Sequence, residues 1–194
     1  MIHPRIRPKD RVGRSDAELM RGVAQGDLAC LGELYDRHAH GVWRAVSRTL
    51  TGSADVEDVV HATFLNLPRI AISYDGRPEC GAWLCGIAVR FSLRHSRGAG
   101  RFRQMLASFA HGVTKCAPSD PERSASNQEE LAIFERALAT LSARKRAVFV
   151  LVELEGLTSE EAAKALEIPA STVRTRLLHA RRELHAALQG GGER

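Results

Sequence analysis

The chain has 194 residues, which is enough for one or two small domains that each bury a core. Hydrophobic residues make up 44% and charged residues 26%, as in ordinary globular proteins, and aromatic residues only 5%, so Leu, Val, Ala and Ile must build the cores. No apolar run approaches the ~18 residues of a membrane span and no signal peptide follows the first arginines, so we expect a cytoplasmic protein without membrane insertion. The net charge of +5 favours an anionic partner, most commonly nucleic acid.

The sequence contains no motif typical of an enzyme. Its eight histidines are scattered, and it lacks a His-Glu-x-x-His metal motif, a glycine-rich phosphate loop and a Gly-x-Ser-x-Gly elbow. Cys80 and Cys85, the closest of the four cysteines, lack the two-residue spacing of a zinc knuckle or redox motif, and we expect free thiols in the reducing cytoplasm. We therefore predict no enzymatic activity, no catalytic residues, no cofactor and no metal site.

Local signals predict four helices in the first half of the chain. Residues 1–14 carry five basic side chains against one acid and indicate a disordered basic tail. Ser15 or Asp16 is expected to cap a first helix that ends at Gly26. Asp27 is expected to cap a second helix that runs to about Leu50. A third helix follows residues 51–53, with acids in its first turn that suit the helix dipole. Pro68 should kink or end it.

A turn over residues 73–78 separates the third helix from a fourth, which starts at about Gly81. The Gly-Ala-Gly sequence at 98–100 is expected to end this first unit, residues 15–97. Residues 98–128 are rich in Ser, Pro, Gly and Asn, which predicts a linker with a short helix over 102–109. A second helical unit is expected over 129–189, followed by a tail at 190–194. The predicted fold is all-α, with two small helical domains joined by a flexible linker.

Residues 157–177 have the pattern of a helix-turn-helix. Thr158 and Glu161 form a capping box at the first helix, and a short turn at 167–169 leads to the second, which Ser171 or Thr172 can cap. Val173 and Leu177 anchor the second helix inward, so its other face is basic and polar. A surface helix with solvated arginines is the simpler alternative, but cap, turn and basic second helix together favour DNA reading. The predicted −35 DNA contacts are Ser171, Thr172, Arg174, Thr175, Arg176, His179 and Arg182.

These segments, in their order and spacing, resemble the extracytoplasmic-function (ECF) sigma factors of the bacterial sigma-70 family. Residues 26–35 look like the opening helix pair of that family's first domain, and residues 55–65 are similar to its polymerase-binding helix. Residues 82–88 look like the start of its promoter-melting helix. Residues 141–146 and the helix-turn-helix match its second domain. The resemblance implies a protein that binds core RNA polymerase and starts transcription at specific promoters.

The resemblance also implies partners for each part. The acidic third helix would contact the clamp helices of the polymerase's largest subunit. Compensation of the helix dipole is the alternative explanation for its acidic residues. The second domain would contact the flap of the second-largest subunit. An anti-sigma factor is the expected regulator. The implied polymerase-binding residues are Asp55, Glu57, Asp58, His61 and Phe64.

The turn before the fourth helix and the helix itself are implied to engage the −10 element as it opens, because an unpaired base needs stacking or hydrogen-bonding partners. The alternative to a DNA contact is core packing for Trp83, and a solvent-exposed helix face for the arginines that follow it. The implied −10 residues are Tyr74, Arg77, Trp83, Arg90, Arg94 and Arg97.

Four residues depart from the family pattern. Arg90 stands where an asparagine is common, Pro68 replaces a large apolar residue, and His179 replaces an arginine. Glu167 replaces the usual turn glycine, so this turn is expected to avoid positive φ. A conventional helix-turn-helix regulator with an N-terminal sensor or dimerisation module is the competing hypothesis, and it predicts tight operator binding without polymerase.

Overall fold

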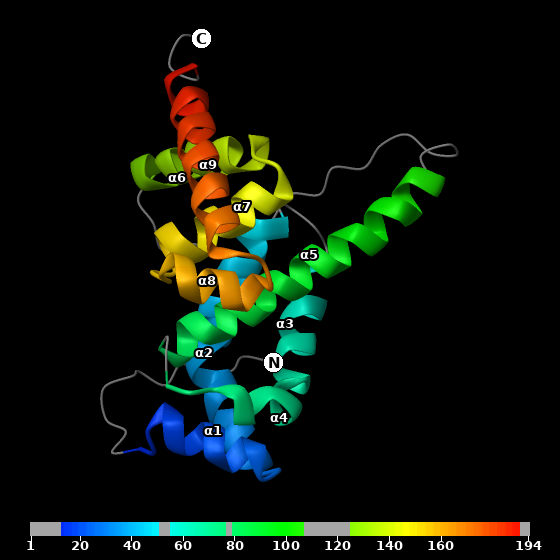
Figure 1. Ribbon diagram of the computed structural model, residues 1–194, viewed down its shortest axis with the longest axis vertical. Coiled ribbons are helices and arrows are strands. Elements are labelled where there is room, and N and C mark those ends of the chain that lie inside the picture. The colour runs from blue at the N-terminus through cyan, green and yellow to red at the C-terminus, as the bar shows by residue number, and fades with distance from the viewer. Residues whose placement is uncertain (1–12, 51–54, 77–78, 107–124, 191–194) are drawn as a thin grey trace.

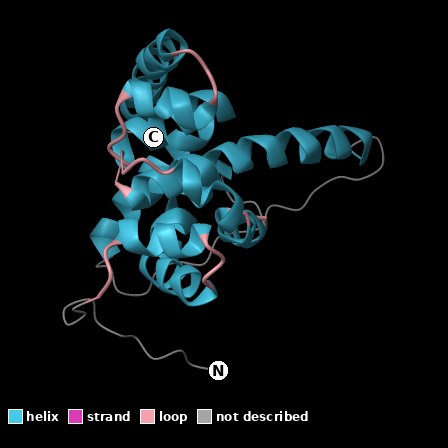
Figure 2. Ribbon diagram, turned by 60° about the horizontal axis from the view of Figure 1, so that its bottom comes forward, coloured by secondary structure: helices cyan, strands magenta, loops and turns pink. Residues whose placement is uncertain are grey.

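The computed structural model describes residues 13–50, 55–76, 79–106 and 125–190. Within these ranges the chain is helical and contains no strand, which confirms the all-α prediction (Figure 2). None of the described helices is both long and apolar enough to span a membrane. The elements of the first half are α1 (Asp16–Ala24), α2 (Leu28–Leu50), α3 (Val56–Leu65), α4 (Leu67–Ile70), the 3₁₀ turn η1 (Ala71–Ser73) and α5 (Cys80–Leu106).

The predicted caps of α1 and α2 are present. Ser15 and Glu18 form a reciprocal capping box at α1. The Oδ1 atom of Asp27 accepts the amide of Ala29 at 2.8 Å, which satisfies a free donor at the start of α2. α3 ends at Leu65, and Pro68 lies in the first turn of α4, where a missing amide costs no helical hydrogen bond. The prediction that the third helix ends near this proline is therefore confirmed.

The prediction that the fourth helix ends at residues 98–100 is wrong. α5 continues through Gly98 and Gly100 to Leu106, and its C-terminal part projects from the rest of the molecule (Figure 1). A glycine inside a helix costs only ~1 kcal/mol relative to alanine. The arginines, Gln104, Met105 and Leu106 that follow are strong helix formers. The short helix expected over 102–109 is thus, over its described residues, the end of α5.

The second half consists of α6 (Ala125–Thr140), α7 (Ala143–Phe149), the π turn η2 (Val150–Leu154), α8 (Ser159–Leu166) and α9 (Ala170–Gly190). α6 begins four residues before Glu129, inside the predicted linker. The predicted capping box of Thr158 and Glu161 is present at α8. Behind the exposed face of α9, Val173 and Leu177 are buried as predicted.

The two halves pack against each other along α5 and α8 (Figure 1). One continuous apolar core includes buried residues of both halves. The crossing is close because α5 has a glycine there: a Cβ atom added at Gly86 would lie 2.8 Å from the Cβ of Ala165. Leu157 also approaches this glycine. The contact brings α5 and the helix-turn-helix within reach of each other.

Two glycine substitutions test whether this packing exists in solution. Gly32→Ala in α2 adds a methyl group to open space, and we expect it to raise the free energy of unfolding by ~1 kcal/mol through helix propensity. Gly86→Ala has the same propensity gain, but its new methyl group overlaps Ala165, so we expect no gain or a net loss. Urea unfolding followed by circular dichroism measures both. Equal stabilisation by the two substitutions would contradict the α5–α8 contact.

Candidate nucleic-acid interface

Arg90 and Arg94 lie on the face of α5 that meets the helix-turn-helix. Both guanidinium groups pair with the carboxylate of Glu167, in the turn between α8 and α9. Arg94 Nη2 is 3.0 Å from Glu167 Oε2, and Arg90 Nη1 pairs with the other oxygen. The Nε atom of Arg90 is buried without a hydrogen-bond partner among the described residues. The two predicted −10 arginines thus bind an intramolecular anion.

Glu167 contradicts the prediction for its turn, because it adopts a left-handed conformation with φ 55°. Such a conformation is unfavourable for a side chain with a Cβ atom. The turn offsets this cost through a hydrogen bond of 3.1 Å from the Ile168 amide to the Ala163 carbonyl and through the two arginine pairs. Glutamate therefore takes the place of the usual glycine because its carboxylate has partners on α5.

Tyr74 and Trp83 form an aromatic pair at the start of α5. Their ring centroids are 5.2 Å apart with an interplanar angle of 57°. Both side chains are partly exposed and pack against the core. Burial raises the pKa of Tyr74 to about 12, so its phenol is neutral and able to donate a hydrogen bond. Trp83 thus packs against the core, as the alternative interpretation predicted, and its role at the −10 element stays a prediction.

The recognition helix α9 presents most of its predicted DNA-contacting residues to solvent. Ser171, Arg174, Thr175, His179 and Arg182 are exposed, whereas Thr172 and Arg176 are half-buried. The capping prediction is wrong: α9 begins at Ala170, so Ser171 and Thr172 lie inside its first turn.

Several side chains of this helix have partners within the chain, among them Thr175, Arg174 and Arg176. The hydroxyl of Thr175 donates to the Ser171 carbonyl at 3.0 Å. Arg174 pairs with Glu160 of α8 at 2.9 Å, and because both side chains are well exposed this pair is weak. Arg174 can therefore exchange Glu160 for a phosphate or a guanine edge at little cost.

The acidic helix α3 forms a third surface. Glu57, Asp58 and His61 are exposed, and Asp55 Oδ2 lies 3.5 Å from His95 Nδ1. Phe64, however, is only 4% exposed and packs edge-on against Tyr35, with ring centroids 4.9 Å apart. We therefore revise Phe64 from a polymerase contact to a core residue that supports the surface.

Sequence reasoning missed the apolar members of this surface. Leu65 is 77% exposed at the C-terminal end of α3, and Ile72 is 86% exposed in η1. Leu65 and Ile72 follow the apolar positions of the third helix in the sequence, and nothing in that pattern indicated that their side chains would be exposed. Of the remaining predicted −10 residues, Arg77 lies outside the described residues, and for Arg97 only the backbone of α5 is described.

This arrangement is that of a two-part promoter-recognition factor, with a helix-turn-helix in one half and acidic, aromatic and cationic surfaces in the other. Models of known families agree. The family described as Sigma-70 region 2 matches residues 34–102, and the one described as Sigma-70, region 4 matches residues 131–184.

Two characterised relatives match nearly the whole chain. The chain is 31% identical over 181 residues to the RNA polymerase sigma factor NccH of Alcaligenes xylosoxydans xylosoxydans, covering 90% of this chain and 95% of that protein. It is 30% identical over 182 residues to the ECF RNA polymerase sigma-E factor of Escherichia coli K12, with the same coverage. The chain therefore belongs to the ECF sigma factors of the sigma-70 family, which are transcription initiation factors. The match in the N-terminal half excludes the conventional regulator.

Solved structures share the fold. CnrH in complex with the cytosolic domain of CnrY superimposes with a TM-score of 0.60 at 26% identity, covering 90% of this chain and 97% of CnrH. The sigma factor RpoE of Bartonella quintana, in complex with the anti-sigma factor NepR, gives a TM-score of 0.65 at 21% identity, covering 81% and 96%. The two-part helical architecture is thus common to proteins of this class.

Proposed function

We propose that the protein binds core RNA polymerase in the cytoplasm through α3 and directs it to promoters by reading −35 duplex with α9 and −10 DNA with α5. It acts as a specificity subunit and performs no catalysis itself. The observation that carries the proposal is the separation of charge: the exposed acids Glu57 and Asp58 lie on α3, and the arginines lie on α5 and α9. An acidic face suits the basic clamp helices, and cationic faces suit DNA.

The closed packing of the two halves is compatible with this function only if it opens. The −10 and −35 elements lie about two helical turns apart, ~70 Å, whereas α8 packs directly on α5. DNA phosphates must also displace Glu167 from Arg90 and Arg94. Polymerase binding supplies the natural opening step, with α3 on the clamp helices and the helix-turn-helix domain on the flap of the second-largest subunit.

An anti-sigma factor is the regulator that we propose. The solved structure of the Bartonella RpoE contains the anti-sigma factor NepR, and that of CnrH contains the cytosolic domain of CnrY. Leu65 and Ile72 are exposed apolar side chains at the end of α3 and in η1. They fit a partner that covers the polymerase-binding surface by hydrophobic contact.

Run-off transcription on a genomic promoter library tests the function, with core polymerase alone and with the protein added. We expect start sites that depend on the protein. The double substitution Glu57→Lys and Asp58→Lys should weaken polymerase binding at least about tenfold and reduce transcription in parallel, because it places like charges against the clamp helices.

The matched control for this charge reversal is Glu129→Lys with Glu130→Lys, which changes two exposed acids of α6 by the same charge. We expect it to leave polymerase binding unchanged. Absence of any protein-dependent start site would refute the proposed function. An equal loss of polymerase binding in both double variants would show that α3 does not contact the polymerase.

A further inference from the structure

A second polar cluster lies away from the promoter-binding surfaces, where α1, α2 and α5 meet. It consists of Asp16 at the start of α1, His38 in the middle of α2 and Cys80 at the start of α5. One ligand atom from each residue lies within 4.8 Å of the others, and His38 Nε2 is 2.9 Å from Asp16 Oδ2. Ligands of a tetrahedral zinc ion lie about 3.3–3.8 Å apart, given its usual bond lengths. A small decrease in the distances between the three ligand atoms therefore allows all of them to bind one ion.

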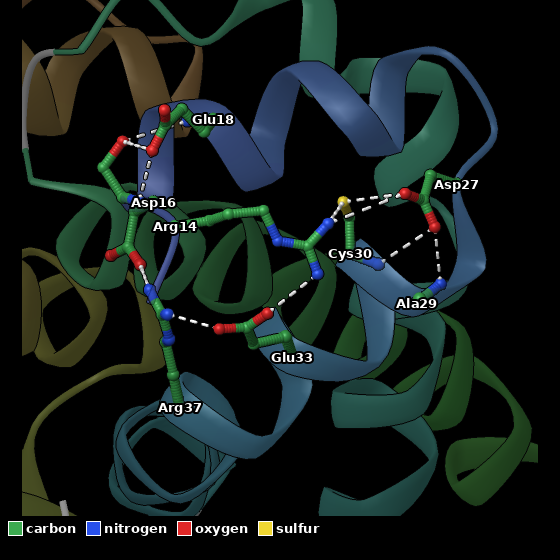
Figure 3. A network of polar contacts seen from close by, with 9 residues as sticks. Arg14, Asp16, Glu18, Asp27, Ala29, Cys30, Glu33 and Arg37 are labelled. Atoms are coloured by element: carbon green, nitrogen blue, oxygen red, sulfur yellow. Dashed lines mark hydrogen bonds and ion pairs between the residues drawn. The ribbon is translucent and has the colours of Figure 1, made fainter. Parts of the chain in front are cut away.

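Neighbouring residues hold the two more exposed ligands in place. Asp16 Oδ1 accepts a hydrogen bond of 2.7 Å from Arg37, which leaves Oδ2 facing His38. Arg37 also pairs with Glu33, so its positive charge is balanced (Figure 3). On the other side of the imidazole, a Cβ atom added at Gly81 would lie 3.2 Å from His38 Nδ1, so the first turn of α5 packs directly against the ring. Such supporting contacts orient ligands in metal sites.

Among the described cysteines, Cys80 is the one whose sulfur lies within 4.8 Å of both a carboxylate oxygen and an imidazole nitrogen. The Cys30 thiol, by comparison, donates to Asp27 at 3.1 Å and accepts from Arg14 (Figure 3). The Cys80 side chain is only 3% exposed, yet no described residue forms a hydrogen bond with its sulfur. Burial raises the pKa of this thiol to about 12. A buried thiol within 4.8 Å of two further ligand atoms supplies the third donor that a zinc site needs.

We propose that Asp16, His38 and Cys80 bind a divalent transition-metal ion, with zinc as the best fit. One carboxylate oxygen, one imidazole nitrogen and one thiolate sulfur form the mixed donor set that zinc accepts, and the two anionic ligands neutralise its charge. The Asp16 and His38 side chains are 31% and 19% exposed, so water can reach a fourth coordination position. The ion takes the place of the Cys80 proton, which is released on binding.

The position of the site gives it a structural consequence. The ion joins α1 and α2 to the first residue of α5, a few residues from Tyr74 and Trp83. Metal binding therefore stabilises the region that carries this aromatic pair by mass action. Asp16, His38 and Cys80 match none of the metal motifs whose absence led us to predict no metal site, and this proposal replaces that prediction.

Cobalt titration of the full chain tests the site, in a Cys116→Ser background that removes the fourth thiol. We expect one Co²⁺ per chain with thiolate-to-cobalt absorption in the near ultraviolet, displaced by Zn²⁺. Cys80→Ser should abolish the absorption, and Asp16→Asn or His38→Gln should weaken binding at least about tenfold.

Cys85→Ser and Cys30→Ser are the matched controls, since each removes another buried thiol of the same chain. Both should retain the cobalt absorption. Circular dichroism of the metal-free variants checks that each is folded. The proposal is overturned if the parent chain binds no cobalt, if its absorption survives Cys80→Ser, or if Cys85→Ser abolishes it equally. A plain hydrogen-bonded cluster predicts the first of these results.

Discussion

Replacing Arg174 and Arg176 with alanine is expected to abolish −35-dependent initiation while polymerase binding remains intact. Arg174 is exposed on the outer face of α9, and Arg176 is half-buried one turn after the buried anchor Val173. A bidentate arginine contact to guanine contributes ~1–3 kcal/mol, so the loss of two should lower promoter affinity at least about thirtyfold. Run-off transcription from a promoter that requires its −35 element measures the effect, and a pull-down with core polymerase measures binding.

The double variant Arg136→Ala with Arg181→Ala is the matched control for charge. Both residues are exposed, and Arg181 lies on α9 but pairs with Glu153. This control also removes two positive charges, but from residues that are not predicted to contact −35 DNA. If it reduces initiation as much as Arg174→Ala with Arg176→Ala, then net charge and not base reading explains the loss. Reduced polymerase binding by the first variant would mean that the roles of the two halves are assigned wrongly.

Salt dependence separates phosphate contacts from base contacts. Each phosphate neutralised by an arginine adds about 0.9 to the slope of log affinity against log salt concentration for duplex DNA. Loss of base contacts would lower affinity and leave the slope nearly unchanged. A fall in slope of about two for Arg174→Ala with Arg176→Ala would instead assign both side chains to phosphates.

The features predictable from sequence are those that depend on neighbouring residues. Ser15, Asp27 and Thr158 cap helices through groups two or three residues away, and Pro68 acts on its own backbone. The alternation of buried and exposed positions along α9 follows from helical periodicity alone. These signals suffice for the all-α class and for the helix-turn-helix.

Three features that sequence reasoning missed depend on contacts between distant segments, unlike the continuation of α5 past residue 100, which follows from local helix propensity. The left-handed Glu167 is tolerated because Arg90 and Arg94, 77 and 73 residues away, hold its carboxylate. Phe64 is buried because Tyr35 on another helix covers it. Asp16, His38 and Cys80 come from three helices and have no spacing that a motif could describe. In each case the partner is supplied by tertiary packing.

Replacing Glu167 with glutamine is expected to strengthen binding of −10 DNA by the free protein. The substitution keeps the shape of the side chain and removes the charge that Arg90 and Arg94 now share. Exposed ion pairs contribute ~0.2–1 kcal/mol each, so release of two should raise affinity about twofold to thirtyfold. Fluorescence anisotropy with a promoter fragment that is single-stranded over the −10 element measures the affinity. Small-angle scattering should show a larger radius if the two halves separate.

Glu183→Gln provides the control, because it removes one exposed carboxylate from α9 that pairs with Lys145 and not with α5. It changes the net charge equally, so an equal gain in affinity would reduce the Glu167 effect to general electrostatics. Combining Glu167→Gln with Arg90→Ala and Arg94→Ala completes a thermodynamic cycle. If Glu167 acts by competing with DNA for these two arginines, its replacement should have no effect once they are absent. A gain that persists without the arginines would place the competition elsewhere on the molecule.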